Sequence, residues 1–370
     1  MTNDLVKKEI GVEELNDVFF MHNQQYRDER TSADWFYFYK KFRPDLSVFG
    51  IIKDGDLIVA TQGMMPYFMN VEGKKILAAK SENTLTDAAY RGRNLFKQVY
   101  DFCLDVSEKK EIQFIWGLTK YGELWERKVG FEYFGGINKI STGLIKIKEV
   151  DLNYFNIYKN ASRMKKLILK PLLYLYLTKL KIKGMMKRNK VFADRIIDNN
   201  KFEIVENLKN DTDLLKAYEN YRLKEEIIHI HQNSKYLDWR LYSNPKLDYK
   251  TLFLYEKDVL LAYAYYSFQP QTKIVNLADF TFFTQQSGIV LLQELFEKLI
   301  KEKISFIKFF GNIKNELVKT TFDLLSSVGF DIKSSGLDLV VKPLGNYHSE
   351  YLNMPSKWHI TGLWFEGYEV

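Results

Sequence analysis

The chain has 370 residues, of which 46% are hydrophobic, and its formal net charge at pH 7 is +7. This length is more than one hydrophobic core usually holds, so we expect two domains. Cys103 is the only cysteine, which excludes an intramolecular disulfide and favours a reducing, cytoplasmic location. The charged residues Lys7, Lys8 and Glu9 stand where a signal peptide would begin its apolar core, so we expect the protein to stay inside the cell.

Turn residues and hydrophobic periodicity predict an ordered series of elements in the first part of the chain. Asp54-Gly55 and Glu72-Gly73 are typical of hairpin turns between strands. In chain order we expect helices near Val12–Asn23 and Ala33–Phe42, strands Val48–Lys53, from Leu57 and Ile76–Thr86, a helix opened by Arg91–Phe96, a strand Gln113–Gly117, and a short helix closing on Val129-Gly130-Phe131.

A strongly basic segment follows. Leu152–Ala193 contains no Asp or Glu. Its eleven positive charges are Lys159, Arg163, Lys165, Lys166, Lys170, Lys179, Lys181, Lys183, Lys187, Arg188 and Lys190. Apolar residues recur here at helical intervals, and Pro171 suits a first helical turn, so we expect a basic amphipathic helix or helix pair.

Three interpretations of this segment stay open. The uncharged run from Pro171 to Thr178 is far shorter than the roughly 20 residues that span a bilayer, which excludes a transmembrane helix. The segment can be a connector whose apolar face packs on a neighbouring domain. It can also lie against an anionic membrane surface or an anionic lipid-linked substrate through residues 159–190. Nucleic acid is the least favoured partner, because no aromatic stacking platform accompanies the charge.

The remaining sequence repeats the first series. We expect helices near Asp213–Leu223 and Lys235–Tyr242, a strand ending at Tyr255, a turn at Lys257-Asp258, strands Val259–Phe268 and Ile274–Phe283, a helix Gly288–Glu302, a strand Ser305–Phe310, and a helix Asn315–Ser327 before Val328-Gly329-Phe330. The hairpin turn and the later glycine are 75 residues apart in the first series, from Gly55 to Gly130, and 71 in the second, from Asp258 to Gly329. This spacing favours two copies of one unit.

The expected fold is therefore α/β, or α+β in layers, with two similar domains that each have a mixed, mostly antiparallel sheet flanked by helices. We expect an N-terminal domain at 1–150, a helical connector at 151–200 and a C-terminal domain at 201–345. The tail 346–370 is rich in aromatic residues and should dock on a domain.

The turn Arg91–Phe96 lies between a predicted strand and a predicted helix. Backbone N–H groups at such a turn and the positive end of the helix dipole bind phosphate, which makes a pyrophosphate-bearing ligand the first hypothesis. The alternative is an ordinary solvated turn.

This order of elements resembles the GNAT acyltransferase superfamily, and its doubling resembles the tandem members. The resemblance implies transfer from acetyl-CoA or another acyl-CoA, with CoA held between two splayed strands. The phosphate loop of that family begins with Arg or Gln, matched by Arg91, and its two small positions fall on Asn94 and Phe96. The implied cofactor-binding residues are Thr84, Leu85, Thr86, Arg91, Gly92, Arg93, Asn94, Leu95 and Phe96. The corresponding Gln285–Val290 lacks a basic residue, so the first domain is favoured.

Acyl transfer needs a base for the acceptor and an acid for the leaving thiolate. The resemblance places a carboxylate base at Glu82, on the strand before the loop. Relatives often have a Tyr acid four residues before the glycine of the Gly-Phe pair, where this chain has Glu126, and Tyr121 is the nearest substitute. Surface or core packing is the alternative role of each. No metal site is expected.

The resemblance implies an N-acyltransferase that acts on an amine. Its acceptor would be a small or lipid-linked molecule, such as an amino sugar or a precursor of a surface polysaccharide. The protein would be cytoplasmic or peripheral at the inner membrane face. Two other classes stay open: a Fem-like aminoacyl ligase that uses aminoacyl-tRNA, and a non-catalytic GNAT-like binding module.

Overall fold

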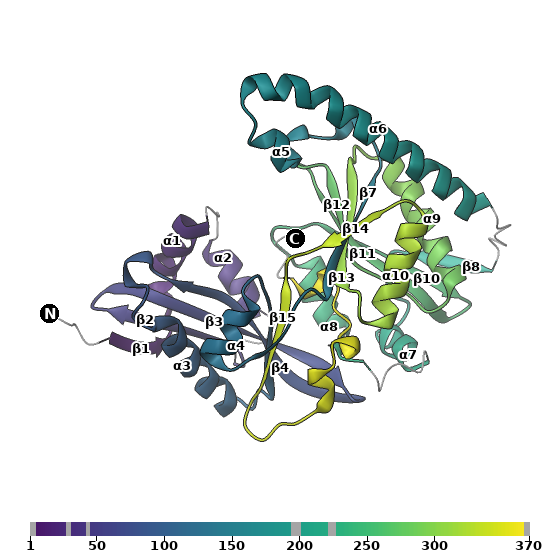
Figure 1. The fold of residues 1–370 in the computed structure, drawn as a ribbon. Helices are drawn as coiled ribbons and strands as arrows, with labels where there is room; N and C mark the ends of the chain where they lie inside the picture. Colours follow the sequence, from purple (N-terminus) through teal and green to yellow (C-terminus); the bar gives the residue numbers. More distant parts are fainter. Residues whose placement is uncertain (1–4, 27–30, 42–44, 194–200, 221–226, 366–370) are drawn as a thin grey trace. The chain divides into compact units, whose positions relative to one another are not determined.

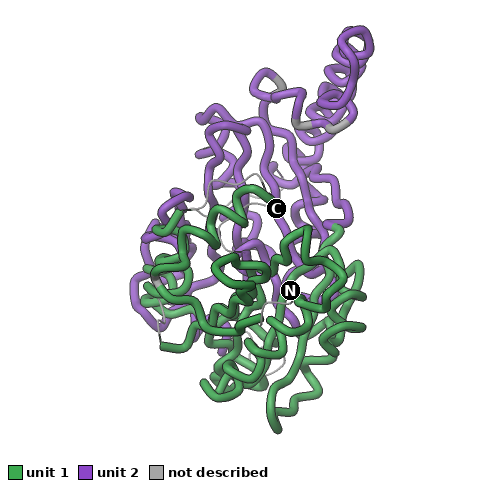
Figure 2. Tube along the Cα trace, turned by 90° about the vertical axis from the view of Figure 1, so that its left-hand side faces the viewer, with its two compact units in different colours: residues 1–137, 225–239, 336–357 green, residues 138–224, 240–335, 358–370 purple. Residues whose placement is uncertain are grey.

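The computed structural model describes residues 5–26, 31–41, 45–193, 201–220 and 227–365 (Figure 1). These residues form two compact units, each assembled from three segments of the chain. Unit 1 consists of 1–137, 225–239 and 336–357, and unit 2 of 138–224, 240–335 and 358–370 (Figure 2).

Unit 1 is built on a sheet, here sheet A, with the strand order β1-β2-β3-β4-β5-β15-β6, and β9 pairs separately with β3. Its elements are β1 (Leu5–Glu9), α1 (Leu15–Tyr26), α2 (Ser32–Trp35), β2 (Val48–Asp54), β3 (Leu57–Val71), β4 (Lys74–Thr86), α3 (Leu95–Lys109), β5 (Phe114–Thr119), α4 (Gly122–Val129), β6 (Glu132–Phe134), β9 (His229–Ile230), α8 (Ser234–Leu237) and β15 (Asp338–Pro343). Of the strand pairs described in sheet A, only β4 and β5 run parallel.

Helix α3 covers one face of sheet A because its apolar residues recur at helical spacing. Val99, Cys103 and Leu104 are buried against residues of β2 and β3 such as Val48 and Val59. Cys103 therefore lies on the packed side of this helix. Burial also raises the pKa of its thiol.

Unit 2 is built on a second sheet, sheet B, with the strand order β14-β7-β13-β12-β11-β10-β8. Its elements are β7 (Asn138–Leu144), α5 (Asn156–Lys159), α6 (Arg163–Ala193), β8 (Phe202–Val205), α7 (Asp213–Asn220), β10 (Tyr249–Glu256), β11 (Val259–Gln269), β12 (Ile274–Phe282), α9 (Gln285–Lys301), β13 (Phe306–Asn312), α10 (Glu316–Ser327) and β14 (Asp331–Ser334). Helices α9 and α10 pack their apolar faces on this sheet (Figure 1).

The predicted fold class is confirmed, because both units have the same order of elements: three antiparallel strands, a helix, a strand parallel to the third, and another helix. The turn residues behave as their sequence predicts. Gly55 has positive φ, as does Lys257 at the corresponding turn of unit 2, and Glu72 and Gly73 at the next turn of unit 1 both have positive φ, which suits tight hairpins.

The units differ from the expected boundaries at 150, 200 and 345, because each sheet contains a strand from the other part of the chain. β7 follows the first series of elements but pairs with β13 and β14 in sheet B. β15 follows the second series but lies between β5 and β6 in sheet A. Strand periodicity tells which face of a strand is buried but not which sheet accepts it, so the sequence did not predict this exchange.

The basic segment forms one long helix, α6, that belongs to unit 2 (Figure 1). Its Leu177 is fully buried with Leu144 and Phe306. The helix continues through Pro171, so the expectation that this proline opens a helix is wrong. Pro171 removes the N–H that would bond the carbonyl of Leu167, and the exposed position of Leu167 lets water replace it.

The end of α10 touches α6 through two glycines. Gly329 has φ +98°, and a Cβ there would lie 2.5 Å from the Cα of Gly184. We expect Gly329→Ala to lower the free energy of unfolding by about 1–2 kcal/mol from the left-handed backbone and by about 1–3 kcal/mol more from the backbone clash. Urea denaturation measures the loss.

Gly336→Ala is the matched control, because Gly336 also has positive φ but a Cβ there meets no atom within 4 Å. Its free energy of unfolding should fall only by the contribution of the left-handed backbone, about 1–2 kcal/mol. Equal losses in the two variants would contradict a close contact between α10 and α6.

Candidate functional site

The candidate site begins where the two parallel strands of sheet A separate. β4 and β5 pair from Ala78 and Phe114 to Lys80 and Trp116. Both strands then continue, β4 to Thr86 and β5 to Thr119. The backbone of each strand beyond the last pair therefore faces a gap in the sheet.

A bulge in β4 accompanies this separation. Thr61 pairs with Leu85 and Gly63 with Glu82, so Asn83 and Thr84 share a single opposing residue, Gln62. Asn83 has φ 55°, the left-handed conformation that Asn tolerates better than most residues. An extra residue on one strand bends it and increases its twist, which turns β4 away from β5.

The buried amide of Gln62 holds the bulge. Its Nε2 donates to the carbonyl oxygen of Gly63 at 2.6 Å and to that of Glu82 at 3.3 Å. Its Oε1 accepts a hydrogen bond from the hydroxyl of Thr84 at 2.5 Å. Gln62 is fully buried, so losing the hydrogen bond from the Thr84 hydroxyl would remove a partner from a buried amide oxygen.

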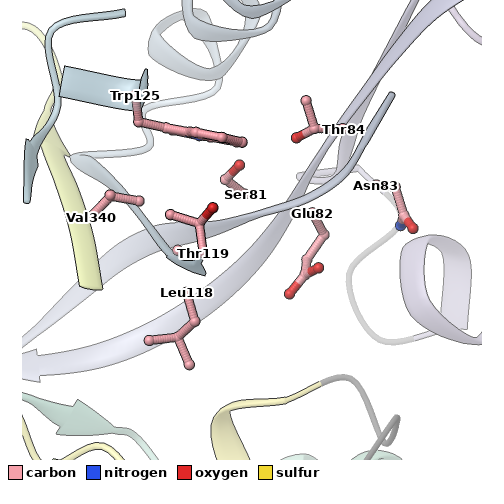
Figure 3. A pocket seen from close by; sticks show the side chains of 9 residues that line it. Ser81, Glu82, Asn83, Thr84, Leu118, Thr119, Trp125 and Val340 are labelled. Atoms are coloured by element: carbon pink, nitrogen blue, oxygen red, sulfur yellow. The ribbon is translucent and has the colours of Figure 1, made fainter. Parts of the chain in front are cut away.

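A small, polar cavity of about 240 Å³ lies in the gap (Figure 3). It is lined by Ser81, Glu82, Asn83, Thr84, Gly117, Leu118, Thr119, Trp125 and Val340. Of the predicted residues, it brings together Glu82 and Thr84. In Figure 3 the carboxylate of Glu82 points away from the indole of Trp125. The two side chains therefore lie on opposite sides of the strand.

Glu82 forms an ion pair with Lys80, two residues earlier on β4. The side chain of Lys80 is 2% exposed and that of Glu82 is 24% exposed. The ammonium of Lys80 also lies 5.8 Å from the ring centroid of Trp116. A buried ammonium needs such partners, because an uncompensated buried charge is costly. The pair therefore fixes the orientation of the carboxylate at the edge of the cavity.

Tyr100 of α3 supports the cavity from within the core. Its hydroxyl contacts Ser81 Oγ and accepts a hydrogen bond of 2.5 Å from Trp125 Nε1. Burial raises the pKa of this phenol to about 12, so it stays protonated at neutral pH. Sequence analysis missed Tyr100 and Trp125 as site residues because their spacing predicted only core packing.

A larger cavity of about 1040 Å³ opens beside the small one and shares Thr84, Leu118, Thr119 and Trp125 with it. Nine predicted residues line it: Thr84, Leu85, Thr86, Arg91, Gly92, Asn94, Leu95, Phe96 and Tyr121. Lys120 and Lys128 join Arg91 there, so three cations face one cavity. Lys120 could have been expected, because it follows β5, whose carboxyl end must lie beside that of its parallel neighbour β4. Lys128 comes from the last turn of α4.

The loop before α3 exposes the N-terminal backbone of the helix. Gly92 has φ 84°, and Asn94, at the N-cap position, has φ 60°. Asn94 makes no side-chain capping bond, so it leaves the first N–H groups of α3 uncapped by a side chain. A Cβ at Gly92 would meet no atom within 4 Å, which shows open space beside the loop. Such a turn has the donors and the dipole that phosphate binding requires.

Phe96 occupies a small position of the expected loop pattern without filling the loop. Its ring lies 5.0 Å from the rings of both Tyr100 and Trp125, measured between centroids. The side chain therefore forms part of the cavity wall. Arg93 does not line the cavity; its guanidinium lies over the ring of Tyr90 at 4.6 Å.

The two predicted acids lie in different surroundings. Tyr121 is 67% exposed and lines the larger cavity. It precedes α4 at the N-cap position, whereas the sequence predicted it within that helix. Glu126 is exposed on α4 and is not among the residues that line either cavity. In the described part of the chain, no three His, Cys, Asp or Glu residues are grouped as metal ligands.

Unit 2 has the same separation of parallel strands but fills it with its own chain. β12 and β13 pair as far as Leu277 and Phe309 and then continue to Phe282 and Asn312. Asn312 N donates to the carbonyl oxygen of Ile360 at 3.0 Å, and Gly311 forms a bridge with Thr361.

On the other side of this gap, a Cβ at Gly362 would lie 3.1 Å from the Cα of Ala278 on β12. Trp358 and Trp364 are buried on either side of these contacts. The segment 358–364 therefore lies between the two strands, where sheet A has its cavities.

A buried polar network joins this segment to β12. Asp279 accepts hydrogen bonds from the hydroxyls of Thr281 at 2.8 Å and Tyr263 at 3.3 Å, and it interacts with Thr361. Desolvation raises the pKa of its carboxyl to about 7. In addition, Thr284 caps α9 with a capping box, so the N–H of Ser287 within the predicted loop Gln285–Val290 already has a side-chain partner.

Comparisons with known proteins point to one superfamily. Residues 8–134 match the model of an acetyltransferase (GNAT) domain. This region contains β4, β5, α3 and α4 and therefore all the predicted site residues. No curated protein gives a significant match to the sequence.

Three solved structures show how far the fold extends. A probable N-acyltransferase from Enterococcus faecalis V583 has a TM-score of 0.60 at 9% identity, over 92% of this chain and 73% of that chain. A tandem GNAT protein from the clavulanic acid biosynthesis pathway has a TM-score of 0.53 at 9% identity, over 93% of this chain and 100% of that chain. N-myristoyltransferase of Saccharomyces cerevisiae with bound myristoyl-CoA has a TM-score of 0.55 at 10% identity, over 94% of this chain and 80% of that chain. At such identities the likeness shows the fold alone.

The buried network of Asp279 predicts a pH-dependent stability. Its pKa is about 7 in the folded protein and about 3.9 when unfolded. The stabilisation from its bound proton is therefore complete below pH about 4 and is lost as the pH rises towards 7.

We expect Asp279→Asn to remove this dependence, which amounts to at most about 1.4 kcal/mol per pH unit. The measurement is chemical denaturation of both proteins at several pH values from 4 to 8. Parallel profiles for the wild type and the variant would contradict the assignment.

Proposed function

We propose that the chain is a two-domain member of the GNAT acetyltransferase superfamily and that it transfers an acyl group from acetyl-CoA, or another acyl-CoA, to an amine acceptor. The observation that carries the proposal is the gap between β4 and β5. This gap opens onto the uncapped N-terminus of α3 and a cavity large enough for an extended ligand. The family match and the neighbours named as N-acyltransferases support the same class of activity.

The residues of the large cavity fit a pyrophosphate. In this proposal the N–H groups after Gly92 and Asn94 bind phosphate oxygens, and the side chains of Arg91, Lys120 and Lys128 compensate their charge. Leu85, Leu95 and Leu124 supply apolar wall for the rest of the cofactor. The corresponding cavity of unit 2, at the start of α9, is smaller, at about 440 Å³, and has no lysine or arginine among its lining residues. Residues 358–364 also occupy the gap between the strands of unit 2, so we propose one acyl-CoA per chain.

The chemistry would take place in the small cavity, next to Thr84 and Thr119, which line both cavities. The backbone beyond the last β4–β5 pair lies at the gap, and its N–H groups would stabilise a developing oxyanion. Glu82 is the proposed base that takes the proton of the amine, and Lys80 orients it. Tyr121, at the edge of the large cavity, is the proposed acid; Glu126 is less well placed because it lines neither cavity.

The acceptor is proposed to be a small polar amine, such as an amino sugar or another precursor of a surface polysaccharide. The small cavity supports this choice because its polar side chains can pair with hydroxyls around an amine. A lipid-linked form of the acceptor and a cytoplasmic or peripheral location remain part of the proposal. Among the described helices, none is both long and apolar enough to cross a membrane.

Cofactor binding is the first test. Acetyl-CoA at a hundredfold over its dissociation constant should stabilise the wild type by about 2.7 kcal/mol, visible as a rise in melting temperature. We expect Arg91→Ala to lose most of this rise, because Arg91 lines the cavity, and titration calorimetry of the wild type to give one site per chain.

Arg127→Ala is the control for lost positive charge, because Arg127 is exposed on α4 and lines neither cavity. It should keep the full rise. A wild type that gains no stability from acetyl-CoA would overturn the acyl-CoA assignment. Stabilisation by aminoacyl-tRNA in its place would point to a Fem-like ligase.

Base catalysis is tested at Glu82. We expect Glu82→Gln to lower kcat by about 10²–10⁴-fold while acetyl-CoA still stabilises the protein. The assay follows release of the CoA thiol with a panel of amines that includes amino sugars. Glu126→Gln makes the same chemical change on exposed α4 and should retain most activity. Equal activity of the Glu82 variant and the wild type would remove Glu82 from the mechanism, and CoA binding without turnover on any amine would favour a binding module.

A further inference from the structure

Helix α6 has two apolar stripes on opposite sides. At 100° per residue, Leu173, Leu177 and Gly184 fall within about 40° of one another. Leu177 and Gly184 are buried, and Leu173 packs on the same cluster as Leu144 and Phe306. This stripe fixes the helix to unit 2.

The second stripe lies about half a turn away and faces solvent. Its residues fall within about 40° of one another at the same 100° spacing. They are Met164, Ile168, Leu175, Ile182 and Met186, with exposed fractions of 72, 66, 69, 54 and 70%. From Met164 to Met186 the stripe extends about 33 Å along the helix at 1.5 Å per residue. A continuous exposed apolar surface of this kind marks an interaction site.

Positive charge borders the stripe. Lys165, Lys179, Lys183 and Lys190 all lie on one side of it at helical spacing, and all four are exposed. Lys183 has an acidic neighbour, Asp331 of β14, at 3.5 Å. The helix itself and the ten residues before it, from Asn153, contain no acidic residue. The exposed face of α6 is therefore apolar along its centre and cationic along its edge.

We propose that this face of α6 adsorbs to an anionic membrane surface, with the apolar stripe in the boundary between headgroups and acyl chains. Exposed lysines beside the stripe can extend their ammonium groups to lipid phosphates while their methylene chains cover apolar surface. A second copy of this chain is a poor occupant, because two cationic faces would repel each other. The helix lies parallel to the surface, since no described helix can cross a bilayer.

Packing of the buried stripe on unit 2 keeps α6 helical, so the exposed stripe is preformed. Leu177 is fully buried in unit 2, so α6 is folded before it meets a membrane. Free amphipathic peptides must instead form their helix on the lipid, which costs conformational entropy. The inference does not depend on acyl transfer, because it rests on residues of unit 2 outside both cavities.

The test uses the full chain and sedimented vesicles. We expect at least tenfold more protein bound to vesicles with about 30% phosphatidylglycerol in phosphatidylcholine than to pure phosphatidylcholine. Binding should fall when the salt is raised from about 0.1 to 0.5 M, because screening weakens surface electrostatics. Equal binding to both vesicles, or none, would overturn the proposal.

A matched pair of variants tests the stripe itself. Ile182→Gln on α6 and Ile300→Gln on α9 make the same change at residues that are 54 and 53% exposed. We expect the double variant Leu175→Gln, Ile182→Gln to reduce binding to anionic vesicles at least tenfold. The control Ile300→Gln should leave this binding unchanged. Circular dichroism checks that each variant is folded. Unchanged binding by the double variant would overturn the proposal. So would dimerisation that the double variant abolishes, because the stripe would then be a contact between copies.

Discussion

The candidate site depends on the early end of pairing between the parallel strands β4 and β5. Their last pair joins Lys80 and Trp116, although β4 extends six residues further and β5 three. The bulge at Asn83 and Thr84 turns β4 away, and the buried amide of Gln62 stabilises the bulge by bonding to both strands of the hairpin. Without this bend, strand pairing would close the space that holds both cavities.

The same plan in unit 2 gives a different result. Its parallel strands also separate, but the segment 358–364 bonds to β13 and packs on β12, so backbone groups of the gap have partners within the chain. One gap thus opens into cavities, and the other is completed by the protein. Duplication of a fold preserves the arrangement of strands, whereas function depends on what occupies the space between them.

Buried polar groups mark both gaps, with different consequences. In unit 1, Lys80 and Glu82 form an ion pair whose carboxylate remains partly exposed at a cavity. In unit 2, the carboxyl of Asp279 is fully buried, and desolvation raises its pKa to about 7. The first arrangement keeps a carboxylate oxygen accessible from the cavity. The second uses hydrogen bonds to hold a segment of the chain in place.

The sequence by itself determined most of the local structure. Hairpin turns at Gly55 and Glu72-Gly73, the strand before Arg91 and the helix after it were predictable, because turn chemistry and hydrophobic period act over a few residues. Nine of the residues that the family resemblance implied line one cavity. Tyr100 and Trp125 were not predictable as site residues, since the pairing of their polar atoms requires two helices to pack together.

Only the tertiary structure decided the rest. The sequence pattern predicted no strand at β7 or β15, and their exchange between sheets depends on edges that distant segments provide. The closing of the gap in unit 2 likewise depends on contacts between Thr361 and Gly311, which are 50 residues apart. Local sequence specifies how each segment folds, whereas partners far along the chain decide which gap stays open.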